Sequence, residues 1–488
     1  MKKYLFAYLL FCSILAPAQT ELVTFENSLN DKAKPNLKEV IPIVNEKNND
    51  ISLFFLHPKK VYGYLLNKNF ELIDKISSED RSRKFKVLLG NSISSNNDYR
   101  IYLTNPSKKK FVTINFSYEK QVSEFKELDL NFNEEHFLQT ITKDNRFYLI
   151  SIVKNSSKFN IYQFDDQANY SKKEVDFSAH SFINHKGKEV KLYDLLFMKI
   201  PGSLIVPKIL MLEKIDLQNP NHIESVADLN KLILRDNEII FCFDQNKEFA
   251  QLAIINLNTL ETQTKKFKKP LYTLDKKSKR TNSFISNDHV YLVASTPEKF
   301  SFTVKDYTDD TLIKRYNLSV DDSIHFKNTP IIQKGGVYVS YRELEKTRKF
   351  LRKITNGNIG ISSYEKDGFY HVMIGGKELI RSGGPMFMPM GGAVGGAAAG
   401  TTMVFFNPAF HAYGAYSQTK ATHIKGLFNK DFEHVKGDMP KNAFDKINDF
   451  KKENSGQRWR TVFKYDEYFV LVNGYLWKNK YTLRMFKD

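Results

Sequence analysis

Short hydrophobic runs alternate with polar turns along most of the chain. One unit recurs, in which an Asn or Asp turn leads into an aromatic and aliphatic strand, a second polar turn and a second strand, as in NNDYRIYLTNPSKKKFVTINF and SNDHVYLVASTPEKFSFTVKDY. Alternating runs bounded by turn residues are typical of β-hairpins. Asn and Asp suit such turns because they tolerate a left-handed backbone. The strand after each turn is apolar on both faces, which predicts burial between neighbouring sheets.

The acids in these turns recur at a nearly constant interval. They lie 48, 46, 92 and 52 residues apart, at Asp50, Asp98, Asp144, Asp236 and Asp288. The double interval predicts a degenerate unit near residue 190, and one further step reaches Gly335. A period of about 40–50 residues with several strands per repeat is typical of a β-propeller, in which four-stranded sheets pack around an axis.

The repeat resembles the broad class of secreted and periplasmic β-propellers whose blades open with a Ser-Asn-Asp or Lys-Asp-Asn turn before an aromatic strand. The sequence lacks the tryptophan–aspartate, kelch and Asp-box signatures that mark particular propeller families, so no single family is identified. The resemblance implies an all-β fold of roughly six to eight blades, with seven favoured. Two stacked β-sandwiches are the alternative. Equivalent strands are expected at residues 99–103, 147–149, 239–241 and 290–292.

Two stretches near the C-terminus break the repeat. The run RSGGPMFMPMGGAVGGAAAGTTMVFFNPAF has no charged residue between Arg381 and Lys420. Farther on, Ala443, Ile447 and Phe450 form an apolar stripe at helical spacing, which predicts a helix. The resulting division is a signal peptide (1–18), an N-terminal extension (19–49), propeller blades (50–380), a Gly/Ala/Met-rich and helical insertion (381–460) and closing blade strands (461–488).

The N-terminus reads as a secretory signal peptide. Lys2 and Lys3 precede a short apolar run, and Ala16-Pro17-Ala18 supplies small residues before Gln19. This pattern predicts cleavage before Gln19 and export to the periplasm, the outer membrane surface or the medium. The alternative is a retained membrane anchor, for which the apolar run is short. Of the two cysteines, only Cys242 remains after cleavage, so no internal disulfide is expected.

The formal net charge of +18 favours an acidic partner. For an exported protein, an envelope membrane protein, anionic lipid or anionic glycan fits this charge better than nucleic acid does. One denser basic patch contains Lys265, Lys266, Lys268, Lys269, Lys276, Lys277, Lys279 and Arg280, with Phe267 and Tyr272 among them. Basic residues with interleaved aromatics can bind nucleic-acid strands. A solvated loop between two strands is the favoured interpretation.

Motifs for catalysis, metals and cofactors are missing from the sequence. There is no Gly-x-Ser-x-Gly elbow, no His-Glu-x-x-His and no phosphate loop. His180 and His185 have no acidic or cysteine partner at metal-ligand spacing. Adjacent acids such as Asp165 and Asp166 point to opposite faces of a strand and read as turn residues. We expect no catalytic residue, metal or cofactor, although blade loops could still assemble an active site.

The charge-free run is the candidate contact surface. Its glycines have the small-xxx-small spacing of close helix packing in membranes. About 17 residues separate Pro389 from Asn407, against ~20 for a membrane span. A buried loop, a segment that dips into a membrane or partner, and a full span all remain open. The expected contact residues are Met386, Phe387, Met388, Met390, Val394, Met403, Phe405 and Phe406.

These observations are compatible with two functions for the chain. The first is a non-catalytic propeller of the cell envelope that binds a membrane protein, lipid or polymer through blade loops and the charge-free run. The alternative is an exported hydrolase or lyase with its site in the central funnel. Acids converging with a histidine at one place would favour the alternative.

Overall fold

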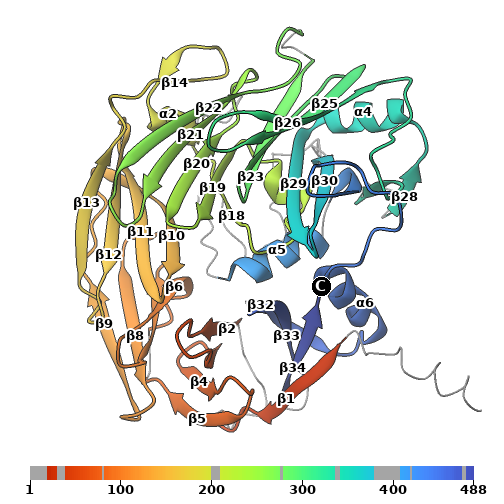
Figure 1. Cartoon of the computed structure of the whole chain (residues 1–488). Coiled ribbons are helices and arrows are strands. Elements are labelled where there is room, and N and C mark those ends of the chain that lie inside the picture. The colour runs from red at the N-terminus through yellow and green to blue at the C-terminus, as the bar shows by residue number, and fades with distance from the viewer. Residues whose placement is uncertain are drawn as a thin grey trace, which may run out of the picture. The chain divides into compact units, whose positions relative to one another are not determined.

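The computed structural model of the chain describes residues 19–29, 39–79, 82–198, 209–274, 278–335, 341–377, 407–417, 420–474 and 480–488. The expected signal peptide lies outside them. The chain divides into two compact units, Met1–Ser78 with Lys441–Asp488, and Glu79–Pro440, and each is considered by itself. Figure 1 labels their strands and helices.

The unit formed by the two chain ends contains two four-stranded antiparallel sheets, ordered β1-β34-β33-β32 and β2-β3-β4-β5. Their strands are β1 (Thr20–Glu26), β2 (Glu39–Val44), β3 (Ile51–Leu56), β4 (Val61–Leu66), β5 (Leu72–Ser77), β32 (Arg458–Tyr465), β33 (Tyr468–Gly474) and β34 (Lys480–Lys487). Because β1 pairs with β34, strands from both ends of the chain share one sheet. Residues 19–49, expected as an extension outside the blades, thus supply the edge strands β1 and β2.

The same unit contains the helix expected from the apolar stripe, α6 (Ala443–Glu453). Its first turn is stabilised by a capping box, in which the Asn442 side chain accepts a hydrogen bond from the Asp445 N–H and the Asp445 side chain accepts one from the Asn442 N–H. A capping box satisfies backbone donors that have no partner within the helix. The buried residues are Ala443, Phe444, Ile447 and Phe450.

The unit Glu79–Pro440 contains three four-stranded meanders among its described residues. The first consists of β6 (Val87–Ile93), β7 (Tyr99–Thr104), β8 (Phe111–Ser117) and β9 (Val122–Leu128). The second consists of β10 (Glu135–Lys143), β11 (Arg146–Val153), β12 (Lys158–Phe164) and β13 (Tyr170–Asp176). The third consists of β23 (Arg280–Ser286), β24 (His289–Ser295), β25 (Lys299–Asp306) and β26 (Leu312–Ser319).

A fourth meander in this unit has an added parallel strand. Its order is β18 (Glu213–Asp216), β19 (Asn230–Arg235), β20 (Glu238–Phe243), β21 (Phe249–Asn256) and β22 (Thr262–Lys268). The pair β18–β19 is parallel, and the remaining pairs are antiparallel. The parallel strand lies beside the first strand of the meander, where it becomes part of the site described below.

Burial along each meander has the gradient of a propeller blade. The second strand is almost fully buried, as in β7 and β24, whereas the fourth strand is mostly exposed, as in β9 and β13. The four runs expected to be equivalent occupy β7, β11, β20 and β24, each the second strand of its meander. This repeated unit confirms the predicted all-β fold of the β-propeller class. Seven blades remains a prediction.

The turn chemistry also matches the prediction. The turns before these second strands contain residues with positive φ: 60° at Asn97, 50° at Asp144, 48° at Asp236 and 51° at Asn287. These side chains tolerate the left-handed backbone at low cost, because they can hydrogen-bond locally. The recurring Asn and Asp residues are therefore required by the turns between first and second strands.

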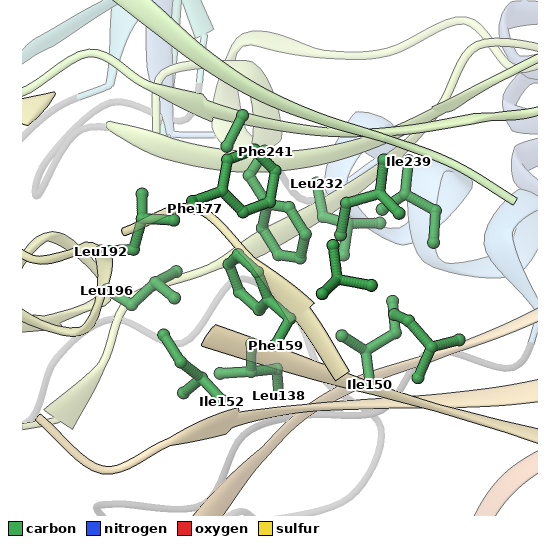
Figure 2. Packing of buried hydrophobic residues seen from close by; sticks show 14 of the residues in the cluster. Leu138, Ile150, Ile152, Phe159, Phe177, Leu192, Leu196, Leu232, Ile239 and Phe241 are labelled. Carbon is green, nitrogen blue, oxygen red and sulfur yellow. The ribbon is translucent and has the colours of Figure 1, made fainter. Parts of the chain in front are cut away.

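Near residue 190, where the spacing predicts a degenerate unit, the described residues form no four-stranded meander. This interval forms β14 (Phe182–Ile183) with β15 (Glu189–Val190), α2 (Leu192–Leu196), and β16 (Phe197–Met198) with β17 (Ile209–Leu210). Leu192 and Leu196 instead extend the hydrophobic core between the sheets on either side. In that core, Phe159 stacks on Phe241 with ring centroids 4.5 Å apart (Figure 2).

The last sheet of this unit shows that the expected insertion is partly core. Its order is β28 (Tyr341–Leu344), β27 (Ile331–Lys334), β31 (Ala421–Phe428), β30 (Phe369–Lys377) and β29 (Asn358–Lys366), with α4 (Thr347–Asn356) before β29. The central strand β31 falls within residues 381–460. The sequence did not reveal it because its pairing partners precede it by a long, non-repeating interval. The prediction of an insertion throughout that range is therefore corrected.

Candidate functional site

A short segment that runs from the start of β18 to the residues before β19 brings three carboxylates together. Glu213 opens β18, Glu224 lies in α3 (Ile223–Val226), and Asp228 follows that helix. The approach to the helix is fixed by Asn221, whose Nδ2 donates to the carbonyl oxygens of Asp216 and Asn219, both within 2.9 Å. These bonds stabilise the approach to α3 within residues 213–228, the acidic segment.

Lys377, the last residue of β30, faces two of these acids. Its Nζ lies 3.5 Å from Glu224 Oε1 and 4.0 Å from Asp228 Oδ1, and donates to the Glu224 carbonyl oxygen at 3.2 Å. Burial opposes the charged form of Lys377, but the neighbouring carboxylates outweigh it and raise the pKa of the ammonium. The lysine is therefore charged and bound to the acidic segment.

The third acid binds the helix α5 (Pro408–Ser417), which lies beside β18 (Figure 1). His411 Nε2 lies 2.8 Å from Glu213 Oε1. At the start of the helix, the Asn407 side chain accepts a hydrogen bond from the Phe410 N–H at 3.1 Å. Near its end, the Tyr416 ring lies 5.4 Å from the buried His222 ring and its hydroxyl accepts a hydrogen bond from Lys425 Nζ at 2.6 Å.

One carboxyl group of this cluster has a raised pKa. Burial raises the pKa of Asp228 to about 6, although 31% of its side-chain surface is exposed and water screens part of that effect. A carboxyl group that titrates near neutral pH, a histidine paired with a carboxylate, and a nearby ammonium are the groups used in acid–base catalysis. The described residues contain no group of three or more His, Cys, Asp or Glu side chains placed to hold a metal ion.

Two further histidines beside the cluster are packing residues. The rings of His222 and His423 lie 5.0 Å apart and are at most 2% exposed. Burial lowers the pKa of His222 well below its usual value and that of His423 to about 3. Both rings are therefore neutral over the ordinary pH range.

The contact residues predicted from the sequence lie outside the described residues. They fall between Lys377 and Asn407, the nearest described residues on either side, of which Lys377 is bound to the acidic segment and Asn407 accepts a hydrogen bond at the start of α5. No sequence motif marks the cluster because its residues come from separate elements, with Glu213 and His411 separated by 198 positions. The one available signal was that His411 is the only histidine between Arg381 and Lys420.

The predicted basic patch is not one continuous surface. Lys269 and Lys279 are buried, at 1% and 0% exposure, which corrects their assignment to the patch. The Lys269 ammonium pairs with buried Asp244, and Lys279 Nζ donates to the Leu271 carbonyl oxygen. Lys276 and Lys277 lie outside the described residues.

Most of the other described basic side chains of the patch contact neighbouring residues of the fold. Lys265 Nζ donates to the Tyr307 carbonyl oxygen at 2.7 Å, and Arg280 Nε donates to that of Gly357 at 3.2 Å. Lys268 Nζ lies 3.6 Å from the ring centroid of Tyr272, while Lys266 is exposed. The exposed charge is therefore smaller than the sequence suggests.

Within the parts of the chain that the structure describes, no helix has the length and apolar character needed to cross a bilayer. No family model matches the chain, and no curated protein matches it.

Several solved structures are similar to the chain. The β-propeller domain of Nup133 from Vanderwaltozyma polyspora is 9% identical over 96% of this chain and 97% of that chain, with a TM-score of 0.37. The β-propeller domain of the trilobed protease from Pyrococcus furiosus is 9% identical over 83% and 94%, with a TM-score of 0.27. The polysaccharide lyase Uly1 is 9% identical over 80% and 77%, also at 0.27. At such scores the fold assignment rests on the sheet topology, and the chain is placed in the β-propeller class without a named family.

Proposed function

We propose that this chain is an exported protein of the cell envelope that binds a membrane component through residues 386–406, the contact segment. One observation supports this function above the others. Lys377 and α5, the described parts of the chain on either side of the contact segment, are both bound to the acidic segment, by the Lys377–Glu224 ion pair and by the 2.8 Å contact between His411 Nε2 and Glu213 Oε1. A segment whose neighbours in the chain are fixed in this way is suited to present its side chains to a partner.

The composition of the contact segment fits this role. Met386, Met388, Met390 and Met403 are unbranched and polarizable, and glycines lie between them. Methionine adapts to irregular apolar surfaces, and glycine lets the backbone approach a partner closely. A hydrophobic segment without charge is suited to an apolar surface, such as a membrane protein or the acyl region of a membrane.

The charge of the whole chain favours an anionic setting for that partner. With a formal net charge of +18, the protein is attracted to anionic lipid, anionic glycan or an acidic membrane protein. Electrostatic attraction of this kind speeds encounter, while the apolar segment supplies short-range contact. No nucleic acid is needed to account for the charge.

A pull-down from detergent-solubilised envelope membranes tests the proposal. The test variant replaces all eight predicted contact residues by serine and keeps the length of the chain. The control replaces Leu72 and Ile73 by serine, two exposed apolar residues on the edge strand β5. We expect the wild type and the control to retain the same partner and the test variant to lose it. Equal recovery by all three would contradict the proposal.

The convergence of His411 with Glu213 and of Lys377 with Asp228 favours a second candidate function, an exported hydrolase or lyase. Acids and a histidine meeting at one place are the pattern expected of that alternative. Release of new ends from anionic envelope polymers by the wild type, lost in His411→Gln at unchanged melting temperature, would support it. No release by the wild type would reject it.

A further inference from the structure

The helix α4, labelled in Figure 1, concentrates positive charge on its exposed face. From its N-cap residue to its last turn it has five basic residues and no acid: Lys346, Arg348, Lys349, Arg352 and Lys353. Lys353 is half-buried, and the other four are exposed. Arg348 pairs with Asp321 at 2.9 Å, but these side chains are 71% and 79% exposed, and such pairs contribute little. Most of this charge therefore faces solvent.

The opposite face of α4 fixes the helix to the last sheet. Phe350, Leu351 and Ile354 are fully buried, and the helix packs against β30 and β31. At the first turn, Thr347 Oγ1 donates to the Asp322 carbonyl oxygen at 2.5 Å. The basic side chains are therefore carried by an element that is anchored in the core.

The charge at the start of α4 opposes the stability of the helix. The positive end of a helix dipole lies at its N-terminus, where acids stabilise the helix and cations destabilise it. Lys346 occupies the N-cap position without a side-chain cap bond, and the first turn contains no acid. Arg348 and Arg352, like Lys349 and Lys353, place like charges four residues apart, which is also unfavourable.

The helix α6 shows that this chain can begin a helix with a full cap. There Asn442 and Asp445 form a capping box, whereas α4 has neither a cap bond nor an acid at its start. Departures of this kind concentrate at functional positions. Anionic groups placed next to α4 would remove both costs, because they pair with the basic side chains and suit the positive end of the helix.

The end of α4 lies near the residue that precedes the contact segment. Asn358, two residues after the helix, pairs with Lys377 across β29 and β30. Lys377 is the last described residue before the contact segment. An anionic polymer or an acidic protein would satisfy the cations alone. A bilayer has phosphates at its surface and acyl chains beneath, so it suits both the basic helix and the apolar composition of the contact segment.

We propose that α4 docks on an anionic bilayer, with its exposed basic face toward the lipid phosphates. This inference rests on the membrane association proposed above and names the lipid surface as the anionic partner. The helix stays packed on its sheet, because its apolar residues are buried in the fold. Attraction of this kind is weak and falls as salt rises, so washing removes it unless the contact segment also engages.

Sedimentation of the full-length protein with vesicles tests this docking. The vesicles contain phosphatidylcholine alone or phosphatidylcholine with phosphatidylglycerol. We expect the wild type to bind only the vesicles with phosphatidylglycerol and to be released by added salt. The test variant Lys346→Ser/Lys349→Glu should bind them at least about tenfold more weakly, because two attractions are lost and one repulsion is gained. Lys346→Arg/Lys349→Arg keeps the charge and should bind as the wild type does.

The melting temperature of the same variant separates docking from folding. Its two substitutions supply the serine and the glutamate of a capping box at the start of α4, so its melting temperature should rise while vesicle binding falls. The control Lys186→Ser/Lys188→Glu makes the same change of charge at two exposed lysines in the turn between β14 and β15. This control should bind vesicles as the wild type does. A lower melting temperature in the test variant would contradict the cost assigned to the charge at the start of α4.

Three results would overturn the docking: no binding of phosphatidylglycerol vesicles by the wild type, equal binding by the wild type and the test variant, or an equal loss in the control. Binding of soluble polygalacturonate but not of vesicles would also overturn it and assign the basic face to an anionic polymer. The comparison is repeated with the eight contact residues replaced by serine. There the dependence on α4 should persist although the membrane pull-down is lost, so failure of this inference and failure of the contact-segment proposal give different results.

Discussion

At the scale of single residues, the chain uses buried charge to join elements that are far apart in sequence. Glu135 is the clearest structural case. Its carboxylate accepts hydrogen bonds from Asn160 Nδ2 at 2.9 Å and the Tyr162 hydroxyl at 2.8 Å, and it also contacts Ser151 and Lys172. Burial opposes ionisation, but these bonds outweigh it and lower the pKa of Glu135. The acidic segment differs, because Asp228 has a raised pKa and fewer partners.

Asp228 predicts a measurable pH dependence of stability. Its pKa is 3.8 in the reference state and about 6 in the fold, so the folded chain binds this proton more tightly. Stability from this group is therefore present at low pH and is lost as the pH rises through about 6. Asp228→Asn removes the loss. We expect the melting temperature of the variant, relative to wild type, to increase from about pH 4 to about pH 7.

Calorimetry at several pH values measures this difference. Asp321→Asn is the control, because the Asp321 side chain is 79% exposed. Its difference from wild type should stay flat over the same range. If Asp228→Asn also gave a flat difference, the carboxyl would not titrate in this window.

At the scale of elements, close approach in the last sheet depends on glycine in β30. A Cβ added at Gly376 would lie 2.6 Å from Ile354 Cα of α4, and one added at Gly375 would lie 2.4 Å from the Thr422 carbonyl oxygen of β31. Contacts this short with backbone atoms cannot be relieved by rotating a side chain. The two glycines therefore allow the helix and the central strand to pack against β30.

We expect Gly376→Ala to destabilise the protein by about 1–3 kcal/mol, the usual cost of overpacking a filled interior. The matched control is Gly456→Ala, because nothing lies within 4 Å of a Cβ added there. Urea denaturation compares the two variants with wild type. Equal midpoints for both variants would show that β30 and α4 separate at little cost.

Local chemistry explains which elements the sequence predicts. Turns and helices depend on interactions between residues a few positions apart, so the sequence predicts them. Examples are the turn residues Asn97 and Asp236 and the helical stripe of Ala443, Ile447 and Phe450. The strand β31 and the pair of Glu213 with His411 depend on partners far along the chain. Periodicity holds no information about such pairs, which is why one central strand and the whole charged cluster were missed.

At the scale of the whole molecule, we propose different roles for the β-propeller fold and for the contact segment. The described residues on either side of the contact segment belong to the fold, since Ala409 and Ala412 of α5 are each 4% exposed and Lys377 is paired with the acidic segment. The sequence between them differs from the repeat in charge, glycine content and period. The central claim is that the contact segment contributes to binding and adds little to the stability of the fold.

The most direct test replaces residues 381–406 by a short Gly-Ser linker and measures melting temperature and membrane retention in the same preparation. The replacement stops before Asn407 because that residue caps α5. The account predicts a melting temperature within a few degrees of wild type, about 1 kcal/mol or less, together with release from envelope membranes in a detergent-free wash. A variant that unfolds, or one that folds and still sediments with the membranes as wild type does, would contradict the claim.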